Sequence, residues 1–337
     1  MSAPSILPKR ALLIGIDYLD SSANRLKGCI DDVVNMREIL VSQYQYAPNN
    51  ITTLRDDSTD PTLMPTGANM VAQLKRIFEN SANFSEIWIH YSGHGSQTQD
   101  ANSVNQSGYD EFLVPCDYAM GGTFIFDRDL YALVKTAKCR VFLLFDCCYS
   151  GTLCDLQWSF DYQYGNYFAR TMNNEHVIDN QQIYMFSGCK ARETSADIFD
   201  ASANEWVGAF TEAFLLSLKN CYYITNMFRL YHDICVNMKN LGFAQKPMFS
   251  SSFANPMFTL SGQGANPTPS PVAPSANILA TKPALQTKTS VNTPNQSFVT
   301  AKRNPRKNFA PVQPIQNNMA FHMSPNKVVP SIGLTFK

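Results

Sequence analysis

The chain has 337 residues, of which 45% are apolar and 12% aromatic, with 27 basic and 27 acidic side chains. The last 76 residues, from Gly262 on, contain eight Lys or Arg, 11 of the 19 prolines and no Asp or Glu. Residues 1–261 therefore have a net charge of −8 and the tail one of +8. This distribution excludes one uniformly neutral body and predicts an acidic body with a basic appendage.

The proline-rich, polar tail can bury too little apolar surface to offset the entropy of ordering it. We therefore predict a flexible N-terminus at residues 1–8, one folded domain at 9–261 and a disordered basic tail at 262–337. About 260 residues are enough for a sizeable core, so no disulfide or metal is needed to hold the domain together.

The first residues lack the apolar stretch of a signal peptide, and no apolar run approaches the ~20 residues of a membrane span. Nine cysteines, an odd number, indicate thiols in a reducing compartment. We expect a cytoplasmic protein without a membrane partner. The basic run KRNPRK (302–307) could act as a nuclear address or a nucleic-acid patch. A solvated linker is the interpretation that we favour, so no nucleic-acid partner is predicted.

Short apolar runs alternate with helical patterns along the body. The predicted strands are 10–16, 51–54, 86–92, 140–146 and 182–188, and the predicted helices are 30–44, 67–80, 127–138, 206–220 and 224–240, with Thr66 and Asp127 as helix starts. Continuous apolar runs are typical of strands buried on both faces. The alternation predicts a three-layer α/β/α sandwich with a mostly parallel sheet of about six strands.

Two stretches interrupt this alternation. Residues 95–109 are polar and contain glycine, and residues 156–180 are aromatic and polar without a clear period. Both are long for loops in a compact domain, and loops of that length are often functional. The second is predicted to be a connection open to proteolysis. Because ligands of α/β sheets bind beyond the carboxyl ends of the strands, catalytic residues are expected there.

Two strands end in residues that can carry chemistry. HYSGHG places His94 between two glycines after strand 86–92, and DCCYSG places Cys147 and Cys148 after strand 140–146. An imidazole near a thiol can generate or stabilise the reactive thiolate. His94 and Cys148 are 54 residues apart, close to the roughly 50 of caspase-type cysteine proteases. A His/Cys pair at one edge of the sheet is therefore predicted.

The chain resembles a type I metacaspase over about residues 9–255. The resemblance rests on six motifs in the family's order: GCIDDV (28–33), YSGHGSQ (91–97), DEFLVPCD (110–117), FDCCYSG (145–151), SGCKARETSAD (187–197) and GAFTEAF (208–214). It implies a caspase-like fold with a large-subunit-like part (9–155), a connecting loop (156–180) and a small-subunit-like part (181–261). It also implies a monomer that hydrolyses peptide bonds after Arg or Lys in protein or peptide substrates, with calcium as cofactor.

The resemblance assigns roles to particular residues. His94 and Cys148 match the catalytic pair, and Cys147 is a neighbour of the nucleophile. The main-chain N–H groups of Gly95 and Cys148 would stabilise the oxyanion. No third catalytic residue is obvious. Autocleavage is expected at Arg170, which is the only basic residue in 156–180.

Four residues match the family's pocket for the substrate side chain: Cys29, Asp32, Ser92 and Asp146. A basic side chain needs carboxylates, and two of these residues supply them. A planar guanidinium can form paired charge-assisted bonds to carboxylates, so Arg is expected to be preferred over Lys.

The match to the family's calcium site is incomplete. Asp110, Asp127 and Asp155 match three acidic ligands, but the fourth position is Arg128. Calcium requires six to eight oxygen ligands, and a guanidinium supplies none. Either Arg128 turns outward and calcium binds weakly, or its charge takes over part of the ion's role and calcium is not needed. We expect the weakened site.

Two further hypotheses arise from the sequence. Arg128, and Tyr149 where many relatives have His, favour an alternative function as a catalytically weak or inactive homologue that acts as a binding or regulatory module. The +8 tail could also fold across an acidic groove of the −8 body and inhibit it.

Overall fold

The computed structural model describes residues 7–99, 109–148, 150–151, 153–164, 167–174, 177–188, 197–200, 205–243 and 245–263. Residues 1–6, Tyr149 and the tail from residue 264 lie outside the described residues. The predictions about the N-terminus, the tail, its KRNPRK run and Tyr149 therefore stay predictions.

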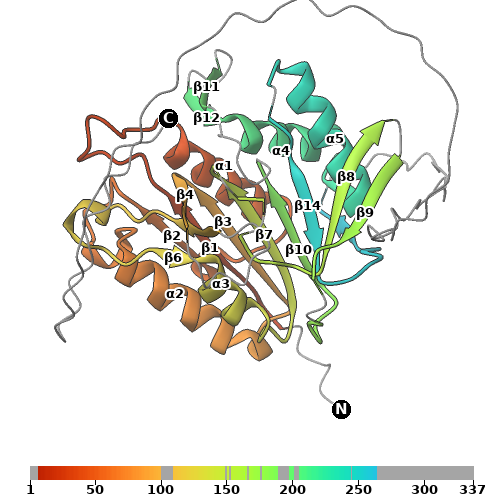
Figure 1. Ribbon diagram of the computed structural model, residues 1–337, viewed down its shortest axis with the longest axis horizontal. Helices are drawn as coiled ribbons and strands as arrows, with labels where there is room; N and C mark the ends of the chain where they lie inside the picture. Colours follow the sequence, from red (N-terminus) through yellow and green to blue (C-terminus); the bar gives the residue numbers. More distant parts are fainter. Residues whose placement is uncertain are drawn as a thin grey trace, which may run out of the picture. The chain divides into compact units, whose positions relative to one another are not determined.

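A sheet of eight strands forms the middle of the domain, in the order β2-β1-β3-β7-β10-β14-β8-β9 (Figure 1). Its strands are β1 (Lys9–Gly15), β2 (Ile51–Arg55), β3 (Glu86–Ser92), β7 (Arg140–Asp146), β8 (Trp158–Tyr164), β9 (Tyr167–Met172), β10 (Ile183–Ser187) and β14 (Met248–Ser251). The first five strands in the sheet are parallel, and β14, β8 and β9 join them antiparallel. The predicted mostly parallel sheet is confirmed, with eight strands where about six were expected.

The segment 156–180 differs from the predicted loop. Most of it folds into the antiparallel hairpin of β8 and β9, which forms one edge of the sheet. Aromatic residues hold the hairpin in place, since Phe160 lies 5.1 Å from Phe249 and Phe168 lies 5.3 Å from Phe228 between ring centroids. The aromatic side chains that obscured the sequence pattern are therefore the ones that attach the hairpin to the domain.

Five helices cover the two faces of the sheet: α1 (Cys29–Ser42), α2 (Gly67–Glu79), α3 (Asp127–Val134), α4 (Ala209–Asn220) and α5 (Met227–Asn240). α1, α4 and α5 lie on one face and α2 and α3 on the other (Figure 1). All five were predicted, although α4 and α5 each begin three residues later than expected because 205–208 and 224–226 form strands. Thr66 caps α2 as expected, accepting the main-chain N–H of Asn69 at 3.2 Å.

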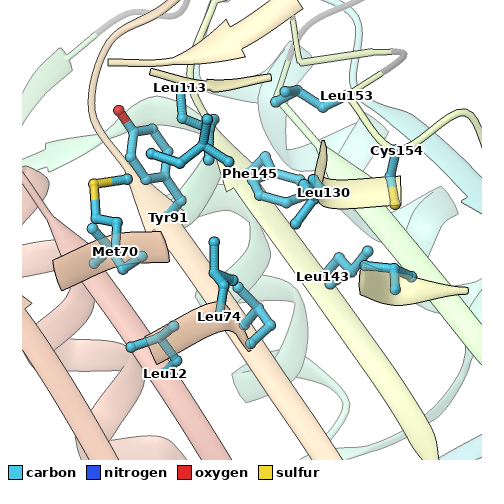
Figure 2. Close-up of a cluster of buried hydrophobic side chains, with 14 of the residues drawn as sticks. Leu12, Met70, Leu74, Tyr91, Leu113, Leu130, Leu143, Phe145, Leu153 and Cys154 are labelled. Atoms are coloured by element: carbon cyan, nitrogen blue, oxygen red, sulfur yellow. The ribbon is translucent and has the colours of Figure 1, made fainter. Parts of the chain in front are cut away.

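Successive side chains of the central strands point to opposite faces of the sheet, and both faces are buried, which explains the continuous apolar runs. In β1, Leu12 and Ile14 face the cluster under α2 and α3, whereas Ala11 and Leu13 face the cluster under α1 and α4. Figure 2 shows the first cluster, in which Leu12, Leu74 and Leu143 come from three different elements. Both faces are buried, so neither periodicity nor polarity marks an exposed side. The predicted α/β/α sandwich is confirmed.

Smaller pairings complete the fold. β4 (Gly95–Gln99), β5 (Tyr109–Leu113) and β6 (Ile125–Phe126) form a three-stranded antiparallel sheet, while β11 (Asp197–Asp200) pairs with β12 (Glu205–Gly208) and β13 (Ile224–Asn226) with β15 (Thr259–Ser261). The polar stretch 95–109 thus begins as a strand and not as a loop. None of the helices in the described part is long and apolar enough to cross a membrane.

Parallel register brings the ends of the central strands together. Gly15 of β1 pairs with Ser92 of β3, and Ser92 pairs with Asp146 of β7. The residues that follow β3 and β7 therefore leave the sheet at the same edge. This is the edge at which the sequence places His94 and Cys148.

Candidate active site

Buried tyrosines hold the main chain of His94. Its N–H donates to the Tyr18 hydroxyl at 2.9 Å, and its carbonyl accepts from the Tyr91 hydroxyl at 2.7 Å. The imidazole lies against the Tyr18 ring, with the centroids 4.5 Å apart. The turn after β3 is thus fixed by side chains of β3 and of the loop after β1, and the ring has little freedom to rotate.

The main-chain carbonyl of Asn24 orients the His94 ring. It lies 2.8 Å from Nε2, and because a carbonyl oxygen only accepts, Nε2 carries the hydrogen. In the neutral ring the basic nitrogen is then Nδ1. Burial lowers the pKa of His94, and the bond to Asn24 opposes this more weakly. The imidazole is therefore neutral near pH 7 and able to accept a proton.

A close approach of Gly95 to the two adjacent cysteines joins the two candidate catalytic segments. A Cβ on Gly95 would stand 2.0 Å from the carbonyl oxygen of Cys148 and 3.2 Å from the Cys147 Sγ. Any other residue would push the His94 turn away from β7. The structure thus places the main chain of Gly95, directly after His94, against that of Cys148.

The two adjacent cysteines differ in accessibility. Cys147 is fully buried in the core under α2 and α3, while Cys148 is partly exposed. A thiol that attacks a substrate must be reachable, and a thiol buried in an apolar core is inert. This difference favours Cys148 as the nucleophile.

Two buried carboxylates lie beside this pair, at the end of β7 and in the first turn of α1. Asp32 is 0% and Asp146 4% exposed. The Ser92 hydroxyl donates to Asp32 Oδ2 at 2.6 Å, and the Gly208 N–H donates to Asp32 Oδ1 at 2.9 Å. A Cβ on Gly208 would stand 2.3 Å from Asp146 Oδ2 and 2.7 Å from Asp32 Oδ2. The predicted residues Asp32, Ser92 and Asp146 therefore gather around the main chain of Gly208.

Cys29, the fourth predicted pocket residue, is the first residue of α1 and is buried. It precedes Asp32 by three positions and thus shares a helix face with it. The main-chain N–H of Cys29 donates to the Asp17 carboxylate at 3.0 Å, which fixes the start of the helix.

The Asp146 carboxylate is held by Thr211, a residue for which the sequence indicated no role. Its Oδ2 accepts both the N–H and the hydroxyl of Thr211, each at 2.8 Å. The Thr211 Oγ1 also lies 3.4 Å from Nε2 of His90. Since the hydroxyl hydrogen points to the carboxylate, Nε2 of His90 is the donor. Burial lowers the pKa of His90 to about 3, so this histidine is neutral. Thr211 thus holds the Asp146 carboxylate, and His90 supports Thr211.

The acidic residues expected to bind calcium lie near one another. Asp110 is in β5, Asp127 is the first residue of α3, and Asp155 follows the Cys148 segment. Burial raises the pKa of Asp155 to about 7, with smaller contributions from the charges of Asp127 and Asp110. The carboxylates are thus close enough to repel one another.

Arg128 is placed differently from our expectation. Its Nη1 contacts Oδ2 of Asp110, and its main-chain N–H donates to Asp127 Oδ1 at 2.6 Å. In the described part of the chain, no three His, Cys, Asp or Glu side chains are arranged to hold a metal ion. The residues therefore do not fit calcium. Arg128 thus points toward Asp110 and not outward, while the expected weak binding of calcium stays a prediction.

Arg170, the expected autocleavage residue, lies in β9 and not in a loop. Its guanidinium donates to the Ala254 carbonyl at 3.1 Å and lies 5.0 Å from the centroid of the Trp158 ring. Cleavage after Arg170 would require this strand to leave the sheet, because a protease binds its substrate as a single extended segment.

Comparison with known proteins identifies the family of the chain. Residues 9–157 match the metacaspase, peptidase C14 domain family. Metacaspase-1 of Kluyveromyces lactis is 30% identical over 294 residues, which are 72% of this chain and 66% of that protein. The chain belongs to the metacaspase family. Metacaspase-1 of Saccharomyces cerevisiae is 29% identical over 72% of this chain, and metacaspase-1B of Aspergillus fumigatus is 28% identical over 72%.

This metacaspase spans about two thirds of the length of these relatives, with 66% of the S. cerevisiae protein and 69% of the A. fumigatus protein covered. Among solved structures, caspase-1 of Spodoptera frugiperda has a TM-score of 0.46 and 11% identity, covering 76% of this chain and 92% of that one. A protein of Geobacter sulfurreducens has a TM-score of 0.49 and 20% identity over 75% of this chain and 94% of that one.

Proposed function

We propose that this metacaspase is a cysteine endopeptidase that cleaves protein or peptide substrates after Arg, and less well after Lys. The observation that carries the proposal is the contact of Gly95 with the main chain of Cys148, which sets the His94 turn against an accessible thiol. Membership of a peptidase family supports the same reaction class.

The chemistry follows from the orientation of the His94 ring. Nδ1 takes the proton of the Cys148 thiol, and the thiolate attacks the scissile carbonyl to form a tetrahedral intermediate. The imidazolium then protonates the leaving amine, and the C–N bond breaks to leave a thioester. A water molecule, deprotonated by His94, hydrolyses the thioester and restores the thiol. Throughout, the Asn24 carbonyl accepts the Nε2 hydrogen and stabilises the imidazolium.

The oxyanion of the tetrahedral intermediate needs donors that are in place before the reaction. We assign this role to the main-chain N–H groups of Gly95 and Cys148, whose backbones are in contact. Both lie on the short segments that leave β3 and β7, so the sheet positions them.

Substrate preference is assigned to Asp32 and Asp146. Two buried carboxylates side by side favour a cation, and both offer oxygen acceptors to a guanidinium. The resemblance to metacaspases implies that the cation they bind belongs to the residue on the amino side of the cleaved bond. A guanidinium can form two parallel bonds where an ammonium acts as a point charge, which favours Arg.

Fluorogenic peptides ending in Arg, Lys or Asp test the proposal. We expect kcat/KM to decrease from Arg to Lys and to be undetectable for Asp. Asp146→Asn should lower kcat/KM for the Arg peptide by about 10- to 150-fold, the value of one charge-assisted hydrogen bond of about 1.5–3 kcal/mol. Equal cleavage after Asp and Arg would contradict the proposal.

A binding or regulatory module of low activity is the second candidate. The observation that favours it is the Gly208 N–H, which already donates to Asp32, so that this chain's own backbone lies between the pocket carboxylates. A peptide with a C-terminal Arg electrophile separates the two. Covalent labelling of Cys148 supports the peptidase, whereas binding without labelling supports the module.

A further inference from the structure

We propose that Arg128 is a built-in cation that takes the place of a calcium ion among Asp110, Asp127 and Asp155, so that this metacaspase is stable without calcium. The inference concerns folding and ion binding and does not rest on the proposed peptidase activity.

Buried negative charge explains why a cation is needed at this place. Asp110 is 3% and Asp127 1% exposed, and a buried carboxylate without compensation is costly. Asp127 accepts the main-chain N–H groups of Arg128 at 2.6 Å and Glu111 at 3.4 Å. Asp110 is compensated by the Arg128 guanidinium.

The Arg128 side chain is held on a second side. Its guanidinium carbon lies 4.6 Å from the centroid of the Phe126 ring, so an aromatic face covers part of the cation. Half of the side chain is exposed, and the charge thus reaches the buried carboxylate from the surface. A guanidinium stays charged over the whole physiological pH range, which makes this compensation permanent.

The same contact excludes calcium. The ion requires six to eight oxygen ligands, and an arginine contributes none. Asp110 Oδ2, which a calcium ion would need, already contacts the guanidinium, and the two cations would repel each other. The described residues accordingly hold no group of three ligands in a suitable arrangement.

The position of this ion pair links it to the catalytic segments. Asp110 pairs with Thr98 across β4 and β5, and β4 begins at Gly95. Arg128 is in the first turn of α3, directly after β6, which pairs with β5. The ion pair therefore ties α3 to the small sheet that starts beside His94.

The position of Asp155 is fixed by the two buried residues that precede it in the sequence. Leu153 and Cys154, which precede it, are buried in the cluster that contains Leu130 of α3 (Figure 2). The segment that follows Cys148 is thus anchored next to the start of α3, where Arg128 lies.

Thermal unfolding tests the proposal with four proteins: wild type, Arg128→Asp, Arg128→Asn and Arg229→Asp. Each is measured in chelator and in millimolar calcium. The last is a matched control, because Arg229 forms a surface ion pair with Asp233 on α5 at 2.7 Å. Arg128→Asn guards against an Arg128→Asp protein that does not fold without the ion, since its side-chain amide is neutral and still offers an oxygen.

We expect the wild type and Arg229→Asp to keep the same Tm in chelator and in calcium. Arg128→Asp should unfold at lower temperature than the wild type in chelator and should regain about 3–6 °C at a calcium concentration about ten times its Kd. Arg128→Asn should respond in the same direction by a smaller amount.

Three results would overturn the proposal: a saturable rise in the Tm of the wild type with calcium, no calcium response in either Arg128 variant, or an equal response in Arg229→Asp. Because Tm is read without substrate, a protein with no peptidase activity would still give a decisive result. Failure of this inference and failure of the proposed function are thereby distinguishable.

Discussion

Replacing Gly208 by Ala should disturb the proposed substrate pocket, because the added methyl group meets both carboxylates. The new Cβ would stand 2.3 Å from Asp146 Oδ2, whereas ordinary van der Waals contact begins at 3.4 Å. The carboxylate would have to move by about 1 Å, and close-packed interiors do not absorb such a shift freely. Asp146 Oδ2 is held by two bonds from Thr211, and Asp32 Oδ2 by Ser92 at 2.6 Å. The methyl group therefore breaks at least one of these bonds or blocks the substrate cation.

The magnitude follows from the bond that is lost. One charge-assisted hydrogen bond of about 1.5–3 kcal/mol corresponds to a decrease of about 10- to 150-fold in kcat/KM for an Arg-ended peptide. The overpacked site should also lower the free energy of unfolding by about 1–3 kcal/mol. The rate at which iodoacetamide alkylates Cys148 should be nearly unchanged, because this small neutral reagent does not use the pocket.

Gly242→Ala is the matched control. Its Cβ would meet no atom within 4 Å, but its φ of +86° strains any other residue, so it loses stability far from the pocket. A folded Gly208→Ala protein whose kcat/KM for Arg peptides equals that of Gly242→Ala would refute the assignment of the pocket to these carboxylates.

Three more substitutions test the site. Gly95→Ala, whose Cβ would stand 2.0 Å from the Cys148 carbonyl oxygen, should lower kcat by about 100-fold with little change in KM, measured by steady-state kinetics; an unchanged kcat would contradict the contact. Thr211→Val removes the hydroxyl that donates to Asp146 and should lower kcat/KM for Arg peptides about tenfold, whereas a change confined to Tm would assign Thr211 a structural role only. The pKa of His90 is about 3 in the folded state, below its ordinary 6.5, so the unfolded state takes up the proton first as the pH falls and stability is lost. Urea unfolding between pH 6.5 and 3 should therefore show a slope for the wild type that exceeds that of His90→Gln by up to about 1.4 kcal/mol per pH unit, and equal slopes would count against a buried neutral His90.

A strand could be predicted from the sequence where its own side chains show how it is buried. β3 and β7 are buried on both faces, so their apolar runs are continuous and easily recognised. β8 has a strict alternation of aromatic and polar residues (WSFDYQY, 158–164), which is typical of a strand with one buried face and was overlooked, whereas β9 (YFARTM, 167–172) has no simple period. Their strand structure depends on packing against α5 and β14, which are more than 50 residues away in the sequence.

The residues of the candidate site likewise include some that the sequence predicts and some that it does not. His94 and Cys148 could be predicted because imidazole and thiol are chemically distinctive, and the strand ends placed them at one edge. Asn24 and Gly208 could not, because each acts through its main chain, which every residue type possesses. The direction of Arg128 also could not be predicted, since it depends on the position of Asp110 in a different strand.

The activity of two variants, in each of which one of the adjacent cysteines is replaced by Ala, tests the central claim most directly. Wild type, Cys148→Ala and Cys147→Ala are compared on an Arg-ended fluorogenic peptide, with the folded fraction of each protein checked by thermal unfolding. Cys147 is buried in the core, so its replacement should lower stability and leave kcat/KM within a few-fold of the wild type. Cys148→Ala should have no measurable activity. Retained activity in Cys148→Ala, or its loss only in a folded Cys147→Ala, would contradict the assignment of the nucleophile.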